Sequence, residues 1–323
     1  MKKKILVFKI GAIGDILMTT PFLRELRGFN ENSQIDFLVG KNCSFILNNN
    51  SNVSNVISYD QDIFFKKKFS LIMKLANKIK TERYDEIYIL DKHWFFSFFS
   101  FLTRIKKRVG FFRDNLSKLF LTSGKKYFEV KHEIDYNLSL INISNVNKKL
   151  DYTVLDESKI KSNLNLFSDY IVLINDGGVN GVENSGIRML PDNKFKELVE
   201  KLSEKNKIYL VGGPNLKKYY NKFISNSNVV NVAGCSIDES FIYLKYAKRV
   251  YTTDCGPMHM AACVNKNITC FFGPTNPKRK APFVSGLEVV WGDEDIYDVR
   301  YELFGDVPVG VDFFSGLIVG DLK

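Results

Sequence analysis

Cysteine and histidine are scarce in this sequence. Its 323 residues include five cysteines and three histidines, and no two cysteines form a Cys-x-x-Cys pair. A zinc module needs several such ligands at short spacing, and a disulfide framework needs a dense set of paired cysteines. Both classes are therefore excluded, no metal site is expected, and free thiols are typical of a reducing cytoplasm.

Long apolar runs are missing as well. The nearest approach, Trp94–Leu102, has about half of the ~20 apolar residues that a membrane-spanning helix needs. The chain begins with Met1, three lysines and an apolar stretch, as signal peptides do, but Lys9 and Asp15 interrupt that stretch and no small-residue cleavage site follows. We therefore expect a buried strand here and a cytoplasmic protein.

Positive charge is confined to one half of the chain. The formal net charge is +10, yet residues 1–150 hold 26 basic and 14 acidic side chains, whereas residues 151–323 hold 20 and 22. The N-terminal half should bind something anionic: nucleic acid, a lipid surface or a phosphorylated substrate. No nucleic-acid-binding motif accompanies the charge, so we expect no nucleic-acid partner. Basic runs at 66–68 and 104–108 could touch anionic lipid, although a solvated helix face is the commoner outcome.

The length predicts two domains of ~150 residues. In the first half, apolar runs typical of buried parallel strands alternate with helical segments. Strands are predicted at residues 5–10, 34–39, 56–58, 86–90 and 109–111, and helices at 15–27, 43–47, 65–83 and 94–102. Pro21 lies inside the first helix, where it should cause a kink or a restart.

The second half repeats this alternation. Strands are predicted at 170–175, 207–211, 229–232, 249–253 and 268–272, and helices at 192–205, 237–247 and 257–264. The fold class is therefore α/β, with two Rossmann-like, doubly wound domains, residues 1–165 and 166–323, and an active site at the carboxyl ends of the strands. The polar segment 142–168 is the expected linker. We expect the tail after about residue 300, with Phe313, Phe314, Leu317 and Ile318, to pack back on the N-terminal domain.

The first candidate site is a glycine turn between a strand and a helix, Lys9-Ile-Gly11-Ala-Ile-Gly14-Asp15. Such a turn lets a substrate approach the backbone closely. It matches neither the dinucleotide fingerprint nor the P-loop, and it carries a carboxylate where a phosphate-binding turn would prefer none. Asp15 is either a functional carboxylate or a helix cap, and the pattern alone favours the cap.

Two further turns lie near the end of the chain. Thr253-Asp254-Cys255-Gly256-Pro257-Met258-His259 opens a helix whose first amides could hold a diphosphate, with Asp254 accepting hydrogen bonds from sugar hydroxyls. His259 lies one turn into that helix, where a packed core histidine is the simpler interpretation. Phe272-Gly-Pro-Thr275 ends a strand, and alone it indicates only a rigid loop.

Together, and in this order, these turns resemble the heptosyltransferases of glycosyltransferase family 9, which extend the inner core of bacterial lipopolysaccharide. The first motif, continued to Pro21, is similar to the family pattern strand–x–G–D–x–x–x–T–x–P. The later ones are similar to D–[ST]–G–x–x–H–x–A–A and FGPT. Arg188-Met-Leu-Pro191 occupies the place of a basic–x–Trp–Pro element. The resemblance covers about residues 1–290.

The resemblance implies a GT-B fold, in which two Rossmann-like domains face a cleft, with the acceptor on the N-terminal domain and the donor on the C-terminal one. It implies an inverting, metal-independent glycosyltransferase that moves a sugar, expected to be heptose from ADP-heptose, onto an anionic acceptor of the lipopolysaccharide-core type. No cofactor is implied beyond the nucleotide sugar. An anionic glycolipid acceptor implies peripheral contact with the inner face of the inner membrane.

Roles follow residue by residue from the same resemblance. Asp15 becomes the catalytic base, which takes the proton of the acceptor hydroxyl as that oxygen attacks the anomeric carbon. The residues implied to bind the acceptor or the diphosphate are Lys9, Gly11, Gly14 and Arg113. The residues implied to bind the donor are Asp254, Cys255, Gly256, Pro257, Met258, His259, Arg188, Gly213, Asn215 and Thr275.

Departures from the family pattern cluster on the donor side. Cys255 replaces the usual serine or threonine, Asn215 stands where an acidic residue often grips the ribose, and Leu190 replaces the tryptophan. Asn175-Asp-Gly-Gly178 replaces a small-residue turn. Sugar transfer stays the first hypothesis. A different nucleotide sugar or acceptor, or an epimerase-like or nucleotide-sugar-binding protein on the same fold, stays open.

Overall fold

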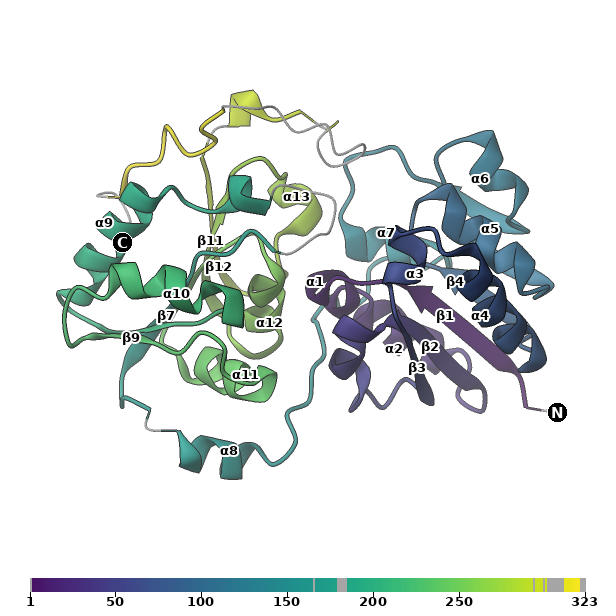
Figure 1. The fold of residues 1–323 in the computed structure, drawn as a ribbon, viewed down its shortest axis with the longest axis horizontal. Helices are drawn as coiled ribbons and strands as arrows, with labels where there is room; N and C mark the ends of the chain where they lie inside the picture. Colours follow the sequence, from purple (N-terminus) through teal and green to yellow (C-terminus); the bar gives the residue numbers. More distant parts are fainter. Residues whose placement is uncertain are drawn as a thin grey trace. The chain divides into compact units, whose positions relative to one another are not determined.

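Two compact units make up the computed structural model, Met1–Asp151 and Tyr152–Lys323. The structure describes residues 2–164, 166–178, 185–292, 294–298, 300 and 311–319. Each unit is built on one six-stranded sheet whose neighbouring strands all pair in parallel, with helices around it (Figure 1). The predicted class, two Rossmann-like α/β domains, is confirmed.

The first unit has the strand order β3-β2-β1-β4-β5-β6. Its strands are β1 Lys4–Lys9, β2 Gln34–Gly40, β3 Asn55–Tyr59, β4 Glu86–Ile89, β5 Lys107–Phe112 and β6 Ser123–Lys126. Its α-helices are α1 Ile13–Leu17, α2 Thr20–Gly28, α3 Asp62–Phe65, α4 Phe69–Thr81, α5 Trp94–Leu102, α6 Asn115–Leu119 and α7 Glu133–Ser139, with a 3-10 helix, η1, at Lys41–Leu47.

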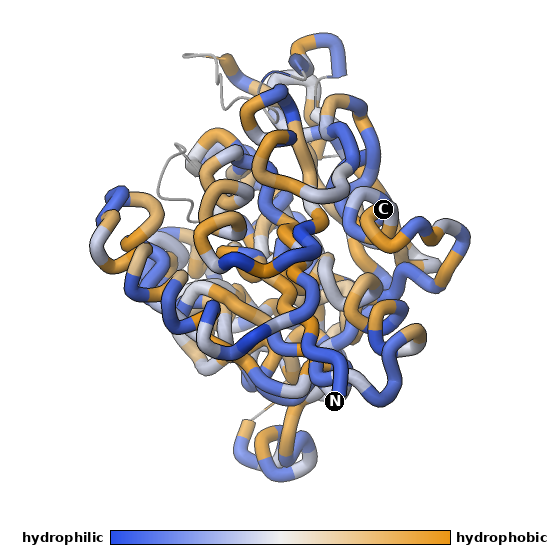
Figure 2. The backbone as a smooth tube through the Cα atoms, turned by 90° about the vertical axis from the view of Figure 1, so that its right-hand side faces the viewer, coloured by the Kyte–Doolittle hydropathy of each residue, from blue (hydrophilic) through white to orange (hydrophobic). Residues whose placement is uncertain are grey.

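Alternate residues of β1 pack on opposite faces of this sheet, as the period of two in a strand requires. Leu6 and Phe8 belong to a core shared with α3, α4 and α5. On the other face Phe22 of α2 packs against Tyr88 of β4, with ring centroids 5.6 Å apart. Figure 2 shows hydrophobic and hydrophilic stretches alternating along the chain.

The predicted helix boundaries are right at Trp94–Leu102 and need correction elsewhere. The first helix restarts as predicted: α1 ends at Leu17, and Pro21 stands at the beginning of α2, where its missing N–H costs nothing. The helix predicted over 65–83 is α4, but its predicted start lies at the last residue of a separate short helix, α3. Lys67, with φ +48°, interrupts the helical path between them.

The second unit has the strand order β12-β11-β10-β7-β8-β9. Its strands are β7 Tyr170–Ile174, β8 Lys207–Leu210, β9 Val229–Asn231, β10 Val250–Thr253, β11 Asn267–Phe272 and β12 Gly286–Trp291. Its α-helices are α8 Glu157–Asn163, α9 Asp192–Ser203, α10 Lys217–Tyr220, α11 Ile237–Tyr246, α12 Gly256–Val264 and α13 Pro277–Lys280. The 3-10 helices are η2 Ser185–Arg188, η3 Pro214–Leu216, η4 Asn221–Phe223 and η5 Glu294–Ile296.

The second unit begins earlier in the chain than residue 166, the predicted start of the second domain. Tyr152 stacks on Phe241 of α11 with ring centroids 3.7 Å apart and donates to Asp238 at 2.8 Å. Glu157, at the start of α8, accepts from Lys245 and Tyr246, both at 2.7 Å. These contacts attach most of the predicted linker to helix α11 of the second unit.

The C-terminal tail corrects a second expectation. Phe313, Phe314 and Leu317 are buried in the hydrophobic core of the second unit, beside α9, and do not pack on the first unit as predicted. Gly273 makes room for them, because a Cβ there would lie 2.8 Å from the Phe314 ring. Ile318 is exposed. Residues 301–310 and 320–323 of the tail lie outside the described residues.

Candidate active site

The glycine turn after β1 is shaped by close packing. Gly11 has φ +139°, a conformation that only glycine adopts without strain, and a Cβ there would lie 3.0 Å from Sγ of Cys43. The neighbouring strand also ends in a glycine: a Cβ at Gly40 would lie 2.5 Å from the Ile10 carbonyl oxygen. The turn therefore lies tightly against η1 and the end of β2.

Asp15 lies in the first turn of α1, next to buried Gly14. No side chain caps this helix at Ala12. Burial and the Asp15 carboxylate raise the pKa of the Cys43 thiol to about 11, so Asp15 lies within electrostatic reach of Cys43. Asp15 is partly exposed to solvent. A partly exposed carboxylate at the carboxyl edge of the sheet is placed as a catalytic base would have to be.

Lys9 is buried and paired with Asp91, which follows β4. Its Nζ lies 3.2 Å from Asp91 Oδ1 and 3.4 Å from the Leu90 carbonyl oxygen, while Asp91 Oδ2 accepts from the Ile10 N–H at 2.7 Å. Burial opposes the lysine charge, but the carboxylates of Asp91, Asp15 and Glu133 outweigh it and raise the pKa of Lys9. Lys9 therefore stays protonated and ties β1 to β4.

A second buried ion pair lies beside the first. Lys92 pairs with Glu133 at the start of α7, and Tyr127 donates to the same carboxylate at 2.6 Å. The Tyr127 ring is flanked by two cations, Lys92 at 4.4 Å and the Arg113 guanidinium at 5.2 Å from its centroid. Arg113, which directly follows β5, is thereby brought to the same sheet edge as Lys9 and Asp15.

Sequence reasoning missed Asp91 and Glu133. They lie 82 and more than 100 positions from Lys9 in the chain, and no local pattern links them. The only available signal was their position: Asp91 directly follows a strand, and Glu133 opens a helix. Polar residues at those places in a doubly wound domain collect at one edge of the sheet.

In the second unit, the predicted donor motif lies where β10 ends and α12 begins. Cys255 is the extended residue preceding the helix, and Pro257 lies in the first turn. The Cys255 Sγ is buried and lies 3.5 Å from the Thr252 hydroxyl, turned toward the strand. Only the backbone of Cys255 is therefore available to a ligand. A serine or threonine hydroxyl in the same rotamer would also point toward the strand, so the cysteine removes no hydroxyl contact to a ligand.

Two buried oxygen atoms near this helix start have no hydrogen-bond partner within the described part of the chain. They are Oδ2 of Asp254, which follows β10, and Oγ1 of Thr275, which lies three residues after β11. Asp254 is 4% exposed and Thr275 7%. Because β10 and β11 are neighbours, Asp254 and Thr275 follow adjacent strands at the same edge of the sheet. A buried carboxylate oxygen without a donor carries a cost of ~1–3 kcal/mol unless a ligand supplies the donor.

His259 is buried one turn into α12, and its carbonyl oxygen accepts from Cys263 Sγ at 3.3 Å. Gly256 and Met258 complete the first turn of the helix, and the Met258 amide donates to the Cys255 carbonyl oxygen at 3.2 Å. The first turn of any helix leaves backbone amides without intrahelical partners. The helix start therefore combines amide donors with the Asp254 acceptor.

Asn175 explains the unusual turn after β7. Its side chain accepts from the Leu190 N–H at 2.8 Å and donates to the Leu190 carbonyl at 3.0 Å. Leu190 is buried in the core. Two residues before it, Arg188 lies close enough to Asp176 to oppose the rise that burial causes in the pKa of that carboxyl group. The departure at Asn175 thus holds the Arg188 segment on the sheet.

Gly213 and Asn215 follow β8, in the loop where the resemblance implies a ribose contact. A Cβ at Gly213 would lie 2.6 Å from Asn215 Oδ1, so the amide folds over the glycine. Asn215 is exposed. The loop runs beside a second one, because the Gly234 N–H donates to the Gly212 carbonyl at 2.9 Å and Cys235 follows. Cys235 is half-buried, unlike the other four cysteines, which are buried.

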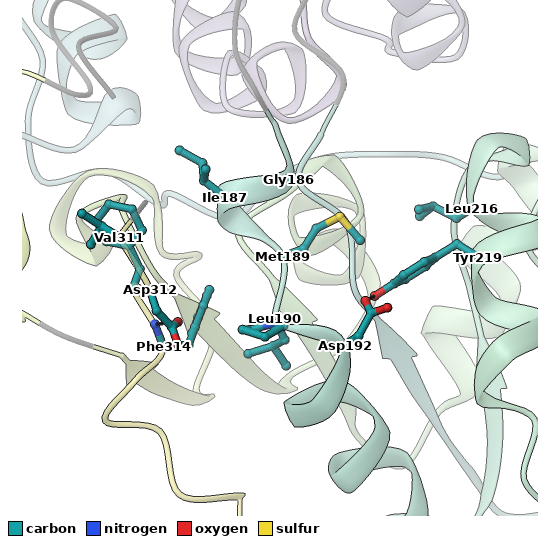
Figure 3. A pocket seen from close by; sticks show the side chains of 12 residues that line it. Gly186, Ile187, Met189, Leu190, Asp192, Leu216, Tyr219, Val311, Asp312 and Phe314 are labelled. Atoms are coloured by element: carbon teal, nitrogen blue, oxygen red, sulfur yellow. Dashed lines mark hydrogen bonds between the residues drawn. The ribbon is translucent and has the colours of Figure 1, made fainter. Parts of the chain in front are cut away.

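A pocket of about 740 Å³ opens in the second unit between the segment 186–192, α10 and the tail (Figure 3). Met189 and Tyr219 point into it, and the Tyr219 hydroxyl donates to Asp192 at 3.0 Å. None of the predicted site residues lines this pocket. Over the described residues there is no group of three or more His, Cys, Asp and Glu side chains that could hold a metal ion.

The predicted site residues therefore fall into two sets. Lys9, Gly11, Gly14, Asp15 and Arg113 gather at the carboxyl edge of the first sheet. Those of the second unit gather at the carboxyl edge of the second sheet: Arg188, Gly213, Asn215, Thr275 and the six residues 254–259. Each set lies where a doubly wound sheet binds its ligands.

The chain is 21% identical over 308 residues to lipopolysaccharide heptosyltransferase 2 of Escherichia coli, covering 89% of this chain and 87% of that one. Among solved structures, it resembles the family 9 glycosyl transferase of Veillonella parvula (TM-score 0.83, 18% identity, 99% and 95% covered). It also resembles the E. coli heptosyltransferase WaaC with ADP-2-deoxy-2-fluoro heptose (TM-score 0.70, 18% identity, 90% and 93% covered).

The structural likenesses show the GT-B fold. The sequence profile described as glycosyltransferase family 9 (heptosyltransferase) matches residues 72–301, well over half of the chain. That stretch contains the Asp254 motif and the Thr275 turn, which carry the buried Oδ2 and Oγ1 atoms at the start of α12 and after β11. The chain therefore belongs to glycosyltransferase family 9.

Proposed function

We propose that this protein transfers heptose from ADP-heptose onto an anionic acceptor of the lipopolysaccharide-core type, with inversion at the anomeric carbon and without a metal ion. The donor binds the second unit and the acceptor the first. The acceptor is a glycolipid, so the enzyme works at the inner face of the inner membrane as a peripheral protein. Membership of the heptosyltransferase family and the ADP-heptose analogue bound by the WaaC relative support this choice of donor.

One observation carries the donor side of the proposal: the buried, unpartnered Oδ2 of Asp254 beside the start of α12. A sugar hydroxyl supplies the donor that this oxygen lacks, while the helix amides at Cys255 and Gly256 receive the diphosphate. Arg188 and the helix end then stabilise the charge that develops on the leaving diphosphate.

On the acceptor side Asp15 acts as the general base. It accepts the proton of the acceptor hydroxyl while that oxygen forms the new bond to the anomeric carbon, and the carbon–oxygen bond to the diphosphate breaks on the opposite face. Lys9 is already paired with Asp91, so it needs no contact with a substrate. We therefore assign Lys9 to positioning the end of β1. Arg113 is assigned to an acidic group of the acceptor.

Replacement of Asp15 by asparagine tests the mechanism. Asp15→Asn keeps the size of the side chain and removes its basicity, so we expect kcat to fall by at least ~100-fold, the usual contribution of a general base. The readout is ADP release with ADP-heptose and a heptose-deficient lipopolysaccharide acceptor. The thermal shift caused by ADP should stay at the wild-type value. Full activity in this variant would remove Asp15 from the mechanism.

Asn215 favours a second candidate, a family member that uses another nucleotide sugar, because an amide replaces the acid expected at the ribose. Thermal shifts with ADP-, UDP- and GDP-sugars separate the two. A saturating donor at a hundredfold excess over its Kd should stabilise the fold by ~2.7 kcal/mol. A shift with UDP- or GDP-sugars alone would replace ADP-heptose. Isomerisation of the donor without any acceptor would instead indicate an epimerase.

A further inference from the structure

Helices α3 to α6 of the first unit expose large apolar side chains to solvent. Phe69 is 58% exposed and Leu119 is 72% exposed, far more than side chains of this size in a closed core. The set that we call the apolar face consists of Phe65, Phe69, Met73, Phe101, Leu116 and Leu119. Isolated exposed apolar residues need no explanation, whereas a contiguous set marks an interaction surface.

A chain of ring contacts connects the helices that carry the apolar face. Phe69 of α4 lies 6.0 Å from Phe95 of α5, and Phe95 lies 6.2 Å from Phe98. Phe98 lies 5.2 Å from Phe120 at the end of α6, which lies 5.8 Å from Phe101. The exposed rings at both ends are thus joined through rings that are partly or fully buried.

The helical spacing brings the remaining members to the same surface. Met73 lies one turn after Phe69 on α4, and Leu119 lies one turn after Leu116 on α6, so each pair shares a helix face. Figure 1 shows α4, α5 and α6 side by side on the first unit, and α4 and α6 each contact α5. Figure 2 views the unit from this side.

Basic side chains surround the apolar face. Residues 65–83 contain seven lysines and arginines and one acidic residue, and residues 104–126 contain eight and one. Exposed members of this basic rim include Lys66, which pairs with Asp62, and Lys67, Lys68, Arg104, Lys106 and Lys118. The one acid of the second stretch, Asp114, is engaged as the N-cap of α6. The rim therefore presents a strong excess of positive charge.

The rim reaches the edge of the sheet where Arg113 lies. His93 begins α5 at that edge, and the positive charges of both Arg113 and Lys67 oppose its protonation, so both cations lie near its ring. Lys67 lies in the loop between α3 and α4, and this loop carries the three consecutive lysines. The basic rim thus extends to Arg113 on the acceptor side of the unit.

We propose that the apolar face and its basic rim dock the protein on an anionic lipid bilayer. Apolar side chains enter the boundary between head groups and acyl chains, while lysines and arginines neutralise lipid phosphates. Nucleic acid fits the surface less well, because Met73, Leu116 and Leu119 offer no ring on which a base could stack. A second copy fits less well too, because two basic rims would repel each other. This inference depends on the proposed function in one respect only, the identity of the acceptor.

Co-flotation of the full chain with vesicles tests the docking surface. We expect binding to phosphatidylcholine–phosphatidylglycerol vesicles, weak binding to phosphatidylcholine alone, and release at high salt. The variants Phe69→Ser/Leu119→Ser and Lys68→Glu/Lys118→Glu should each weaken binding at least ~10-fold. The matched control Ile224→Ser/Phe283→Ser removes two side chains of the second unit that are 46% and 45% exposed, and should bind like the wild type.

Several results would overturn the proposal: wild-type protein that does not float, equal binding to neutral and anionic vesicles, or unchanged binding by both surface variants with wild-type melting temperatures. Salt-sensitive binding to nucleic acid in place of vesicles, or self-association lost in the Phe69→Ser/Leu119→Ser variant, would assign the face to another partner. Transfer to a deacylated acceptor separates this proposal from the enzymatic one. Normal transfer without flotation defeats the docking alone, and flotation without transfer to any acceptor defeats the enzymatic function alone.

Discussion

The amide side chain of Asn175 holds the segment around Leu190 in place in the second unit. It is fully buried and satisfies both the N–H and the carbonyl of Leu190. In Asn175→Ala the N–H and the carbonyl of Leu190 lose their hydrogen-bond partner, and leaving each of them unsatisfied costs ~1–3 kcal/mol. We expect the free energy of unfolding to fall by roughly 2–4 kcal/mol and Tm by roughly 5–15 °C in calorimetry. The KM for the donor should rise, because Arg188 loses its anchor.

Asn77→Ala provides the matched control, because Asn77 is exposed on α4 and alanine favours the helix there. Its Tm should equal or slightly exceed the wild-type value. A Tm within about 2 °C of wild type in Asn175→Ala would mean that the Leu190 segment is held by other contacts.

Single residues also mark where the sequence was informative about the site. Asp15, Asp254 and Thr275 follow strands in motifs with fixed spacing, so their place at the sheet edges was predictable. Asp91 and Glu133 were not, because they meet Lys9 only through the pairing of β1 with β4 and through α7. Asn175 was read as a departure from a small-residue turn, and its partner at Leu190 lies 15 residues away.

Helix α5 begins on a histidine, which makes this element sensitive to acid. Nδ1 of His93 accepts from the Phe95 N–H at 3.3 Å, and only a neutral ring can do so. Burial, Arg113 and Lys67 lower the pKa of His93 below its usual 6.5. The unfolded chain therefore binds this proton more readily, and stability falls as the pH drops through about 6.5.

His93→Asn keeps a capping acceptor and removes the titration. Melting temperatures of the two proteins should agree near pH 8 and differ by roughly 1–3 °C near pH 5, with the variant higher. Parallel curves over that range would show that the cap of α5 makes no contribution to the acid sensitivity.

Among the elements, the buried strands were the easiest to predict, and two of the four edge strands, β6 and β12, were missed. β6, Ser123–Lys126, is an exposed edge strand without an apolar residue, so it carries no hydrophobic signal. β12, Gly286–Trp291, is an edge strand of the second sheet and is only partly buried. The break between α3 and α4 was hidden because apolar spacing continues across it, and only the backbone at Lys67 shows it.

On the scale of the whole molecule, the proposed function implies that charge distinguishes the two substrates. The first half of the chain carries most of the basic excess, so an anionic acceptor is drawn to it over a longer range than the donor is to the second half. We expect kcat/KM for the acceptor to fall roughly tenfold between low and high salt. The KM for the donor should change far less.

Initial rates with a deacylated acceptor across a series of salt concentrations measure this difference without vesicles. A neutral analogue of the acceptor serves as the control, since its kcat/KM should hardly respond to salt. Equal salt dependence for donor and acceptor would show that the basic excess has no part in acceptor capture.

Within the second unit, the burial of all cysteines but one has a practical consequence. Cys235 lies two residues before α11 and directly after Gly234, and a Cβ at Gly234 would lie 3.3 Å from Cα of Pro214, in the loop that carries Gly213 and Asn215. Burial raises the pKa of its thiol, so a maleimide dye should react slowly at neutral pH and faster in mild alkali. The natural sequence thereby supplies a single attachment point for a fluorophore beside the loop that carries Gly213 and Asn215, and titrations with the proposed donor could be followed optically without an engineered cysteine.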